Sequence, residues 1–296
     1  MLIHIELQMK ATPKRLLATS DLHWGLYPAG DACTLELAQR VCESDADAFV
    51  IAGDVADINL ENFEACLRVF DAFKGLKLLV PGNHDLWTTS GSSMEKYQTL
   101  LPRIAEACGF SMLDAGPAVL GDAAFIGNIG WYDYSFRNPE MGLSTEDYRY
   151  KALPGVCSWN DSIYINWDLD DEEFTEMCLR KLRQHYSQVE PRVKRVVAVL
   201  HHVPFAELLY GPSSRPLEFC RAYLGSERFG HLLLRCEKVR YVICGHRHGR
   251  DSFHKGKLRA FVVGSEYETK SLMELDLRSG EHSYIDFRPA PQTAKP

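Results

Sequence analysis

The decapeptide LKLLVPGNHD, at residues 76–85, joins a short apolar run to a cluster of polar side chains. An apolar run of this length, ended by Pro and Gly, is typical of a buried strand. The same order recurs in AFVIAGDVAD at residues 48–57 and in RLLATSDLH at residues 15–23. In open α/β sheets, ligand sites gather at the carboxyl ends of the strands. The three segments therefore predict three strands that bring their polar clusters to one edge of a sheet.

Helix-like segments separate these strands. Leu60, Phe63, Leu67 and Phe70 recur every three or four residues, which is the spacing of one face of a helix. Strands that alternate with helices predict a largely parallel sheet with right-handed crossovers. The same patterns along the whole chain predict helices at residues 35–43, 60–73, 94–108, 171–186 and 227–236, and later strands at residues 118–120, 123–127, 193–200, 239–244, 258–263, 272–277 and 283–287.

Six of the eleven histidines fall in polar clusters that follow strands. Two of these clusters lie late in the chain, His201-His202 after one strand and Gly245-His246-Arg247-His248 after another. Together the clusters supply carboxylates, imidazoles and one amide, which are the ligands that a pair of divalent cations needs. This combination indicates a two-metal hydrolase.

The motifs and their order resemble the calcineurin-like metallophosphoesterase superfamily. They are Asp-x-His at residues 21–23, Gly-Asp-x-x-Asp at 53–57, Gly-Asn-His-Asp at 82–85 and Gly-His-x-His at 245–248. The resemblance spans residues 21 to 248. It implies an α/β fold, a four-layer sandwich in which two mixed β-sheets are flanked by helices.

The resemblance also implies how the ligands divide between two divalent ions. One ion would be held by Asp21, His23, Asp54 and His248, and the other by Asp54, Asn83, His201 and His246. Asp54 would bridge the ions, because each oxygen of its carboxylate can take one of them. A hydroxide bound to the metals would then attack phosphorus, since two bound cations lower the pKa of a water to about 7.

His84 is expected to act on the substrate rather than on a metal. By the same resemblance it stabilises the charge that develops on the phosphoryl group, or protonates the leaving group. Asp85 would orient and charge the His84 imidazole, as a carboxylate does in a catalytic triad. Asp57 would support the site by holding a ligand or the turn at the end of a strand.

Two points of the predicted site have alternatives. His201 and His202 are adjacent, so their side chains point in different directions on an extended chain and only one should bind metal. We favour His201, with His202 as its support. Arg247 would face either solvent or a substrate phosphate.

Gly53, Gly82 and Gly245 are expected to make sharp turns that residues with a Cβ would resist.

Composition limits the partners and the compartment. A net charge of −7 argues against a dedicated nucleic-acid surface. Nine cysteines without a C-x-x-C pair predict buried free thiols and a cytoplasmic protein. The sequence has no apolar run of about 18 residues, so no membrane span is expected. Alternating apolar residues at positions 3, 5, 7 and 9 predict an N-terminal edge strand.

We expect one catalytic domain over residues 1–296, with an insertion at about residues 131–170. This segment is rich in Trp and Tyr and is interrupted by Pro and Gly. A loop of this length inside a domain is often functional, so a lid over the site is the simplest interpretation. Its aromatic side chains would pack the lid onto the domain, or one or two would stack on a planar leaving group.

The predicted function is metal-dependent hydrolysis of a phosphate ester. The substrate would be a phosphodiester or a phosphomonoester, either a small molecule or a phosphoprotein. Mn, Fe and Zn all suit mixed nitrogen and oxygen ligands. Two alternatives are a nuclease with the same chemistry and a non-catalytic interaction module with the same fold. The oligomeric state is left open.

Overall fold

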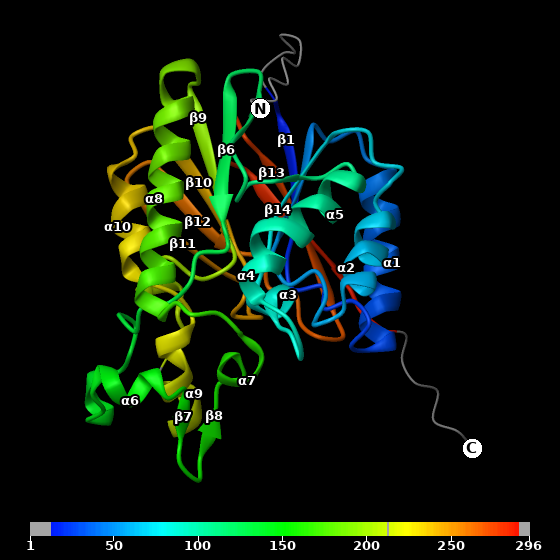
Figure 1. Ribbon diagram of the computed structural model, residues 1–296. Coiled ribbons are helices and arrows are strands. Elements are labelled where there is room, and N and C mark those ends of the chain that lie inside the picture. The colour runs from blue at the N-terminus through cyan, green and yellow to red at the C-terminus, as the bar shows by residue number, and fades with distance from the viewer. Residues whose placement is uncertain (1–12, 212, 290–296) are drawn as a thin grey trace.

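Figure 1 shows the computed structural model of the chain, which describes residues 13–211 and 213–289. The strand predicted at residues 3–9 lies outside these residues. Two six-stranded sheets pack face to face, and helices cover their outer faces. The predicted α/β sandwich of two mixed sheets is confirmed.

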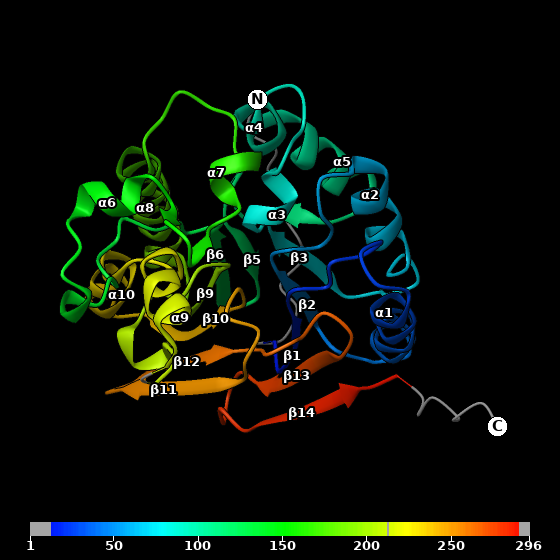
Figure 2. The same ribbon diagram turned by 90° about the horizontal axis from the view of Figure 1, so that it is seen from below.

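The first sheet contains the three strands that precede the first three motifs. Its order is β14-β13-β1-β2-β3-β4. Strands β1 to β4 run parallel, β13 is antiparallel to β1, and β14 is antiparallel to β13. Helices α1, α2 and α5 lie on its outer side (Figure 2). The strands are β1 (Arg15–Thr19), β2 (Ala48–Ala52), β3 (Leu76–Val80), β4 (Ser111–Met112), β13 (Lys270–Asp276) and β14 (His282–Phe287), and the helices are α1 (Pro28–Cys42), α2 (Leu60–Arg68) and α5 (Leu101–Ala107).

The second sheet has the order β11-β12-β10-β9-β6-β5 and is also mixed. Helices α8 and α10 cover its outer face (Figure 2). The strands are β5 (Ala118–Leu120), β6 (Ala123–Asn128), β9 (Arg195–Leu200), β10 (Val239–Cys244), β11 (Asp251–Lys255) and β12 (Leu258–Val262), and the helices are α8 (Asp171–Val189) and α10 (Glu227–Arg235).

Alternate side chains of the central strands fill two different parts of the core. Val50 of β2 packs in the cluster between the sheets with Val199 of β9 and Ile243 of β10. Its neighbours Phe49 and Ile51 belong to the cluster under the helices. All five side chains are fully buried, and burying one such side chain contributes about 1.5–3 kcal/mol. Strands that are apolar on both faces therefore hold the four layers together.

Several predicted helix boundaries were wrong. Helix α1 begins at Pro28, seven residues before the prediction, because a proline suits the first turn and Gly30 packs under the backbone of Tyr267. Helix α2 ends at Arg68, although the predicted helix extended to residue 73. The apolar spacing continues beyond its end because the turn that follows also buries Phe70 and Phe73.

The helix predicted at residues 94–108 is divided into three pieces. A short helix α4 (Ser93–Glu95) leads into a π-helical turn at Lys96–Leu100 and then into α5. Pro102 lacks the N–H that would bond to the preceding turn, which accounts for the wider turn before it. Strand β11 was not predicted, because its side chains are partly or fully exposed and carry no alternating pattern.

The aromatic-rich segment at residues 131–170 contains only short elements. They are a 3-10 turn at Pro139–Met141, α6 (Thr145–Arg149), the hairpin of β7 (Ala152–Leu153) and β8 (Cys157–Ser158), and α7 (Asp161–Tyr164). Figure 1 shows this segment beyond the lower ends of the sheets, near α9 (Arg215–Cys220). Trp131, Tyr132, Tyr134 and Tyr148 are fully buried, so most of its aromatic side chains pack the segment onto the protein. None of the helices in the described residues is long and apolar enough to cross a membrane.

Candidate metal centre

The predicted site residues all follow the carboxyl ends of strands. The first sheet supplies Asp21 after β1, Asp54 after β2 and Asn83 after β3. The second sheet supplies His201 after β9 and the pair His246 and His248 after β10. The site therefore lies where the ends of both sheets meet.

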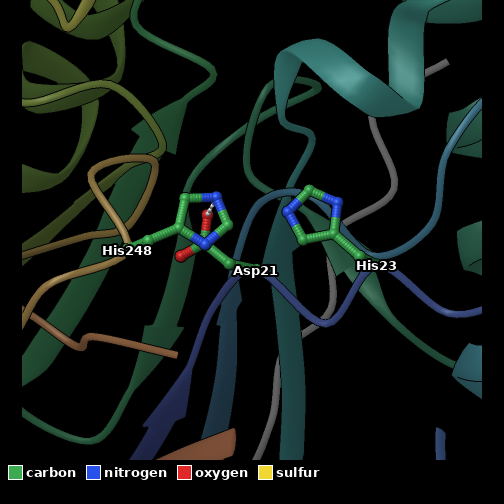
Figure 3. A group of neighbouring side chains, drawn as sticks. All are labelled: Asp21, His23 and His248. Carbon is green, nitrogen blue, oxygen red and sulfur yellow. Dashed lines mark ion pairs between the residues drawn. The ribbon is translucent and has the colours of Figure 1, made fainter. Parts of the chain in front are cut away.

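Asp21, His23 and His248 form one group (Figure 3). One ligand atom from each lies within 4.8 Å of the other two. The Nε2 atom of His248 is 4.0 Å from Oδ1 of Asp21, and the rings of His23 and His248 are stacked with centroids 5.2 Å apart. These residues, with Asp54, are the set predicted for one ion.

Asp54, His201 and His246 form a second group of the same size. Nε2 of His201 lies 3.3 Å from Oδ2 of Asp54, 3.2 Å from Oδ1 of Asn83 and 3.1 Å from Nδ1 of His246. Oδ2 of Asp54 is also 3.6 Å from Nε2 of His23. Asp54 is therefore placed between the two groups, where the predicted bridging carboxylate should be.

His201 and His202 point in different directions, as adjacent residues should. Nδ1 of His201 donates to the carbonyl of Ala52 at 2.9 Å, which leaves Nε2 facing Asp54 and Asn83. His202 bonds through Nδ1 to the carbonyl of Ile129 at 3.0 Å, and its ring packs against Trp131. The geometry favours His201 as the ligand and His202 as its support.

The backbone at the predicted ligands is strained. Among the described residues, eight that are not glycine have positive φ, and five of these are predicted ligands, namely Asp21, His23, Asp54, His246 and His248. The left-handed conformation costs a residue with a Cβ about 1–2 kcal/mol. Strain of this kind collects at functional sites and persists because the surrounding structure holds it.

The three glycines at the predicted sharp turns contribute to the site in two ways. Only Gly53 of the three has a positive φ, of 89°, so only there does the backbone conformation itself favour glycine. Gly82 and Gly245 make room for carboxylates instead. A Cβ on Gly82 would lie 2.0 Å from Oδ1 of Asp54, and a Cβ on Gly245 would lie 2.6 Å from Oδ2 of Asp21.

The partner of His84 differs from the prediction. Nδ1 of His84 hydrogen-bonds to Oδ1 of Asp57, not to Asp85. The carboxylate of Asp85 instead accepts the backbone N–H groups of Val55 at 3.2 Å, Ala56 at 2.9 Å and Gly82 at 2.8 Å. The predicted pairing of Asp85 with His84 was wrong because Asp85 turns back into the first turn of its own helix and braces the Asp54 loop.

The family model for calcineurin-like phosphoesterases matches residues 14–250. The chain belongs to this family. It is a hydrolase of phosphoester bonds, and the family implies a dinuclear centre of divalent metals. No curated protein sequence matches the phosphoesterase.

Solved structures share the fold of this phosphoesterase. A phosphopantetheinyl hydrolase from Mycobacterium tuberculosis is similar with a TM-score of 0.72 and 21% identity, over 96% of this chain and 99% of that one. A dimetal phosphatase from Danio rerio is similar with a TM-score of 0.54 and 14% identity, over 94% and 100% of the two chains. At these identities the likeness concerns the fold.

The buried polar atoms of the phosphoesterase fit two cations. Within residues 13–211 and 213–289, Oδ2 of Asp21, Oδ2 of Asp54, both ring nitrogens of His23 and Nδ1 of His248 are buried without a hydrogen-bond partner. Buried polar atoms are normally satisfied, so such a cluster calls for an explanation. Metal coordination would satisfy carboxylate oxygens and imidazole nitrogens together.

The charges of the phosphoesterase site also favour cations. Burial opposes a charge on His201, but the negative charge of Asp54 outweighs burial and raises the pKa of His201 to about 9. Burial opposes the charge on Asp57 as well, but the nearby imidazoles of His23 and His84 lower its pKa to about 2. Negative charge therefore outweighs burial at His201, which favours a cation beside it, whereas burial lowers the pKa of His23 and His246.

Arg247 lies between two predicted ligands but is held by the protein itself. Its guanidinium donates to the carbonyls of Leu208 and Gly249 and pairs with Asp251 at 2.9 Å. Its side chain is 7% exposed. Arg247 was predicted to face either solvent or a substrate phosphate. It faces neither, because its guanidinium is buried and bonded to groups of the protein.

Two residues that support the phosphoesterase site were missed. Lys270 is fully buried, and its Nζ donates to the carbonyls of Asp21 at 3.0 Å and Tyr267 at 3.1 Å. Asp161 accepts a hydrogen bond from Asn83. Lys270 opens an apolar strand, where a lysine is unusual, and that was the one available signal. Asp161 belongs to no motif, so its role depends on the folded structure.

Proposed function

We propose that this phosphoesterase binds two divalent ions and hydrolyses a phosphate ester, either of a small molecule or of a phosphoprotein. One ion would be held by Asp21, His23, Asp54 and His248, and the other by Asp54, Asn83, His201 and His246. The observation that carries this proposal is the position of Asp54, whose Oδ2 faces His23 at 3.6 Å and His201 at 3.3 Å. When bound, two such ions would polarise the phosphoryl group and activate a water at neutral pH.

The protein's own contribution to the reaction would come from His84. Burial opposes its protonation, but the charges of Asp54 and Asp57 raise its pKa above the usual value, which favours a proton on the ring. Its ring lies between His23, with centroids 4.6 Å apart, and Trp87, stacked at 3.6 Å. His84 held in this way would donate its proton to the leaving oxygen or stabilise charge on the phosphoryl group.

The aromatic residues beside the site support a substrate that is an ester with an apolar or planar leaving group. The Tyr267 ring lies 4.9 Å from the ring of His23 and 4.7 Å from that of His248. Tyr267 is 39% exposed, and Tyr27 beside it is 42% exposed. Aromatic rings next to the reacting phosphate would contact such a group. The similar phosphopantetheinyl hydrolase adds a phosphopantetheinyl ester to the substrates worth testing.

Other parts of the prediction remain proposals. We propose that residues 131–170 are an insertion in one catalytic domain, that the ions are Mn, Fe or Zn, and that the protein is cytoplasmic. All nine cysteines are free in the structure, which supports a reducing compartment. The same chemistry in a nuclease is a weaker proposal, because the net charge of −7 opposes binding of a polyanion.

The test is hydrolysis of bis-p-nitrophenyl phosphate, p-nitrophenyl phosphate and a phosphopantetheinyl ester by metal-stripped protein titrated with Mn²⁺, Zn²⁺ or Fe²⁺. We expect turnover that depends on metal and is lost in Asp54→Asn and His84→Ala. His254→Ala, an exposed histidine on β11, should keep full activity. Two bound ions with no turnover on any ester would instead support the non-catalytic module.

A further inference from the structure

We infer that Asp161 is a positioning residue that fixes the side-chain amide of Asn83 with its oxygen toward the metal centre. The inference rests on the proposed function, because it concerns the ion that Asn83 would bind. Asp161 begins helix α7 in the aromatic-rich segment, 78 positions from Asn83 in the sequence. A residue of this segment would then complete a site that the strands alone leave unfinished.

The carboxylate of Asp161 is surrounded by donors. Its Oδ1 accepts Nδ2–H of Asn83 at 2.9 Å and Nε1–H of Trp87 at 2.6 Å. Its Oδ2 accepts the hydroxyl of Tyr132 at 2.9 Å and Nε1–H of Trp159 at 2.7 Å. Asp161 is 1% exposed, so water does not compete for these positions. Four bonds hold the carboxylate in one orientation.

A carboxylate in this place distinguishes the two ends of the Asn83 amide. An amide has a donor end and an acceptor end of nearly the same shape, whereas an ionised carboxylate only accepts. The NH₂ group must therefore face Asp161, and Oδ1 faces the other way, 3.2 Å from Nε2 of His201. Only the oxygen of an amide can bind a divalent cation, so this orientation is the productive one.

The same carboxylate oxygen also supports His84. Trp87, which donates to Oδ1 of Asp161, stacks its ring on that of His84. Tyr164, at the other end of α7, stacks on Trp87 in turn, with its ring centroid 4.9 Å from that of Trp87. Helix α7 therefore connects a predicted metal ligand and the predicted acid through one buried group.

The test compares Mn²⁺ binding by wild-type protein, Asp161→Asn and Asp171→Asn. The amide introduced by Asp161→Asn would have the shape of the carboxylate but could donate as well as accept, so it would no longer select one orientation of Asn83. Asp171 is the matched control, because it is a buried carboxylate that accepts from Trp131, Tyr134 and Lys151. Calorimetry gives the two affinities, and electron paramagnetic resonance shows whether two Mn²⁺ ions are coupled.

For Asp161→Asn we expect one ion bound as in wild type and the other weakened by roughly 10–100-fold, the usual effect of losing the support of a ligand. The coupled Mn²⁺ signal should be replaced by that of a single ion. Asp171→Asn should bind both ions as wild type does. In an Asn83→Ala background, Asp161→Asn should have no further effect, because the residue it positions is gone.

Unchanged affinity and an unchanged coupled signal in Asp161→Asn would overturn the inference. An equal loss in Asp171→Asn would do the same, since the cause would then be general loosening of the segment. Wild-type protein that binds fewer than two ions would refute the proposed function and the inference with it. Should Asp161→Asn fail to fold, Trp159→Phe removes one bond to Oδ2, and unchanged affinity there would also count against the role of Asp161.

Discussion

His84 and Asp57 are joined by a hydrogen bond between Nδ1 of the imidazole and Oδ1 of the carboxylate. The same oxygen of Asp57 is 3.6 Å from Nδ1 of His23, a predicted ligand. Asp57 therefore contacts both the predicted acid and the metal centre. The two acidic residues near His84 have separate tasks, because Asp85 is bonded to backbone N–H groups.

Asp57→Asn should weaken catalysis according to the leaving group. If Asp57 keeps His84 protonated and oriented, the variant should lose about 10–100-fold in kcat for phenyl phosphate, whose leaving group needs a proton. The loss should be smaller for p-nitrophenyl phosphate, whose leaving group departs without one. Steady-state kinetics with both esters at saturating Mn²⁺ measure this ratio.

Asp85→Asn is the comparison for that experiment. The carboxylate of Asp85 braces the loop that carries Asp54. Its replacement by an amide should therefore lower the melting temperature and reduce kcat for both esters by the same factor. If Asp85→Asn showed the dependence on the leaving group and Asp57→Asn did not, the pairing of Asp57 with His84 would have no role in turnover.

Gly53→Ala should destabilise the protein far more than Gly91→Ala. The two glycines have nearly the same φ, 89° and 87°, so the conformational strain of an alanine, about 1–2 kcal/mol, is matched. A Cβ on Gly53 would lie 2.2 Å from Nδ1 of His201, whereas one on Gly91 would have no atom within 4 Å. Urea denaturation of the two variants gives the difference, and equal losses would mean that His201 moves aside freely.

Removing the metals should lower stability without unfolding the protein. The two sheets bury their own core, so the stripped protein should keep its far-ultraviolet circular dichroism. Added Mn²⁺ should raise the melting temperature, since a ligand at 100 times its Kd stabilises by about 2.7 kcal/mol. In Asp54→Asn, added Mn²⁺ should raise the melting temperature by less than in wild type. Loss of the folded signal on chelation would instead indicate a structural metal site.

Acid should destabilise the protein partly through His185. Burial, with a small contribution from Lys181, lowers the pKa of this imidazole to about 4. The unfolded chain, with a pKa of about 6.5, takes up the proton first, so stability is complete above pH 6.5 and is lost as the pH falls toward 4. His185→Leu should lose less stability than wild type between pH 7 and pH 4.5. His231→Leu, an exposed control on α10, should follow wild type in the same denaturation series.

The strands and the ligand clusters were predictable from sequence because their signals are local. Strand β10 has the predicted bounds, and β1, β2 and β3 open the three segments predicted to contain them, since each is a mainly apolar run that ends at a polar motif. Helix ends were less predictable. The apolar spacing after α2 continues into a buried turn at Phe70 and Phe73, so spacing alone extends the helix too far.

Contacts between distant segments could not be predicted in the same way. Asp85 is adjacent to His84 in sequence, whereas Asp57 lies 27 positions away. Only the folded structure shows that Asp85 is held by backbone N–H groups and that Asp57 pairs with His84. Lys270 reaches Asp21 across 249 positions and Asp161 reaches Asn83 across 78. Such partners depend on the packing of β13 and α7, which no single segment encodes.

Because the predicted ligands are divided between two sheets, we expect the packing of the core to influence metal selectivity. One sheet carries Asp21, Asp54 and Asn83 at the ends of its strands, and the other carries His201, His246 and His248. The separation of these two halves is set by side chains such as Val50, Val199 and Ile243, which fill the space between the sheets. Protein interiors are close-packed, so a change of one methyl group there alters spacing elsewhere. We therefore expect that a core substitution far from the predicted ligands would change which size of ion the phosphoesterase binds best.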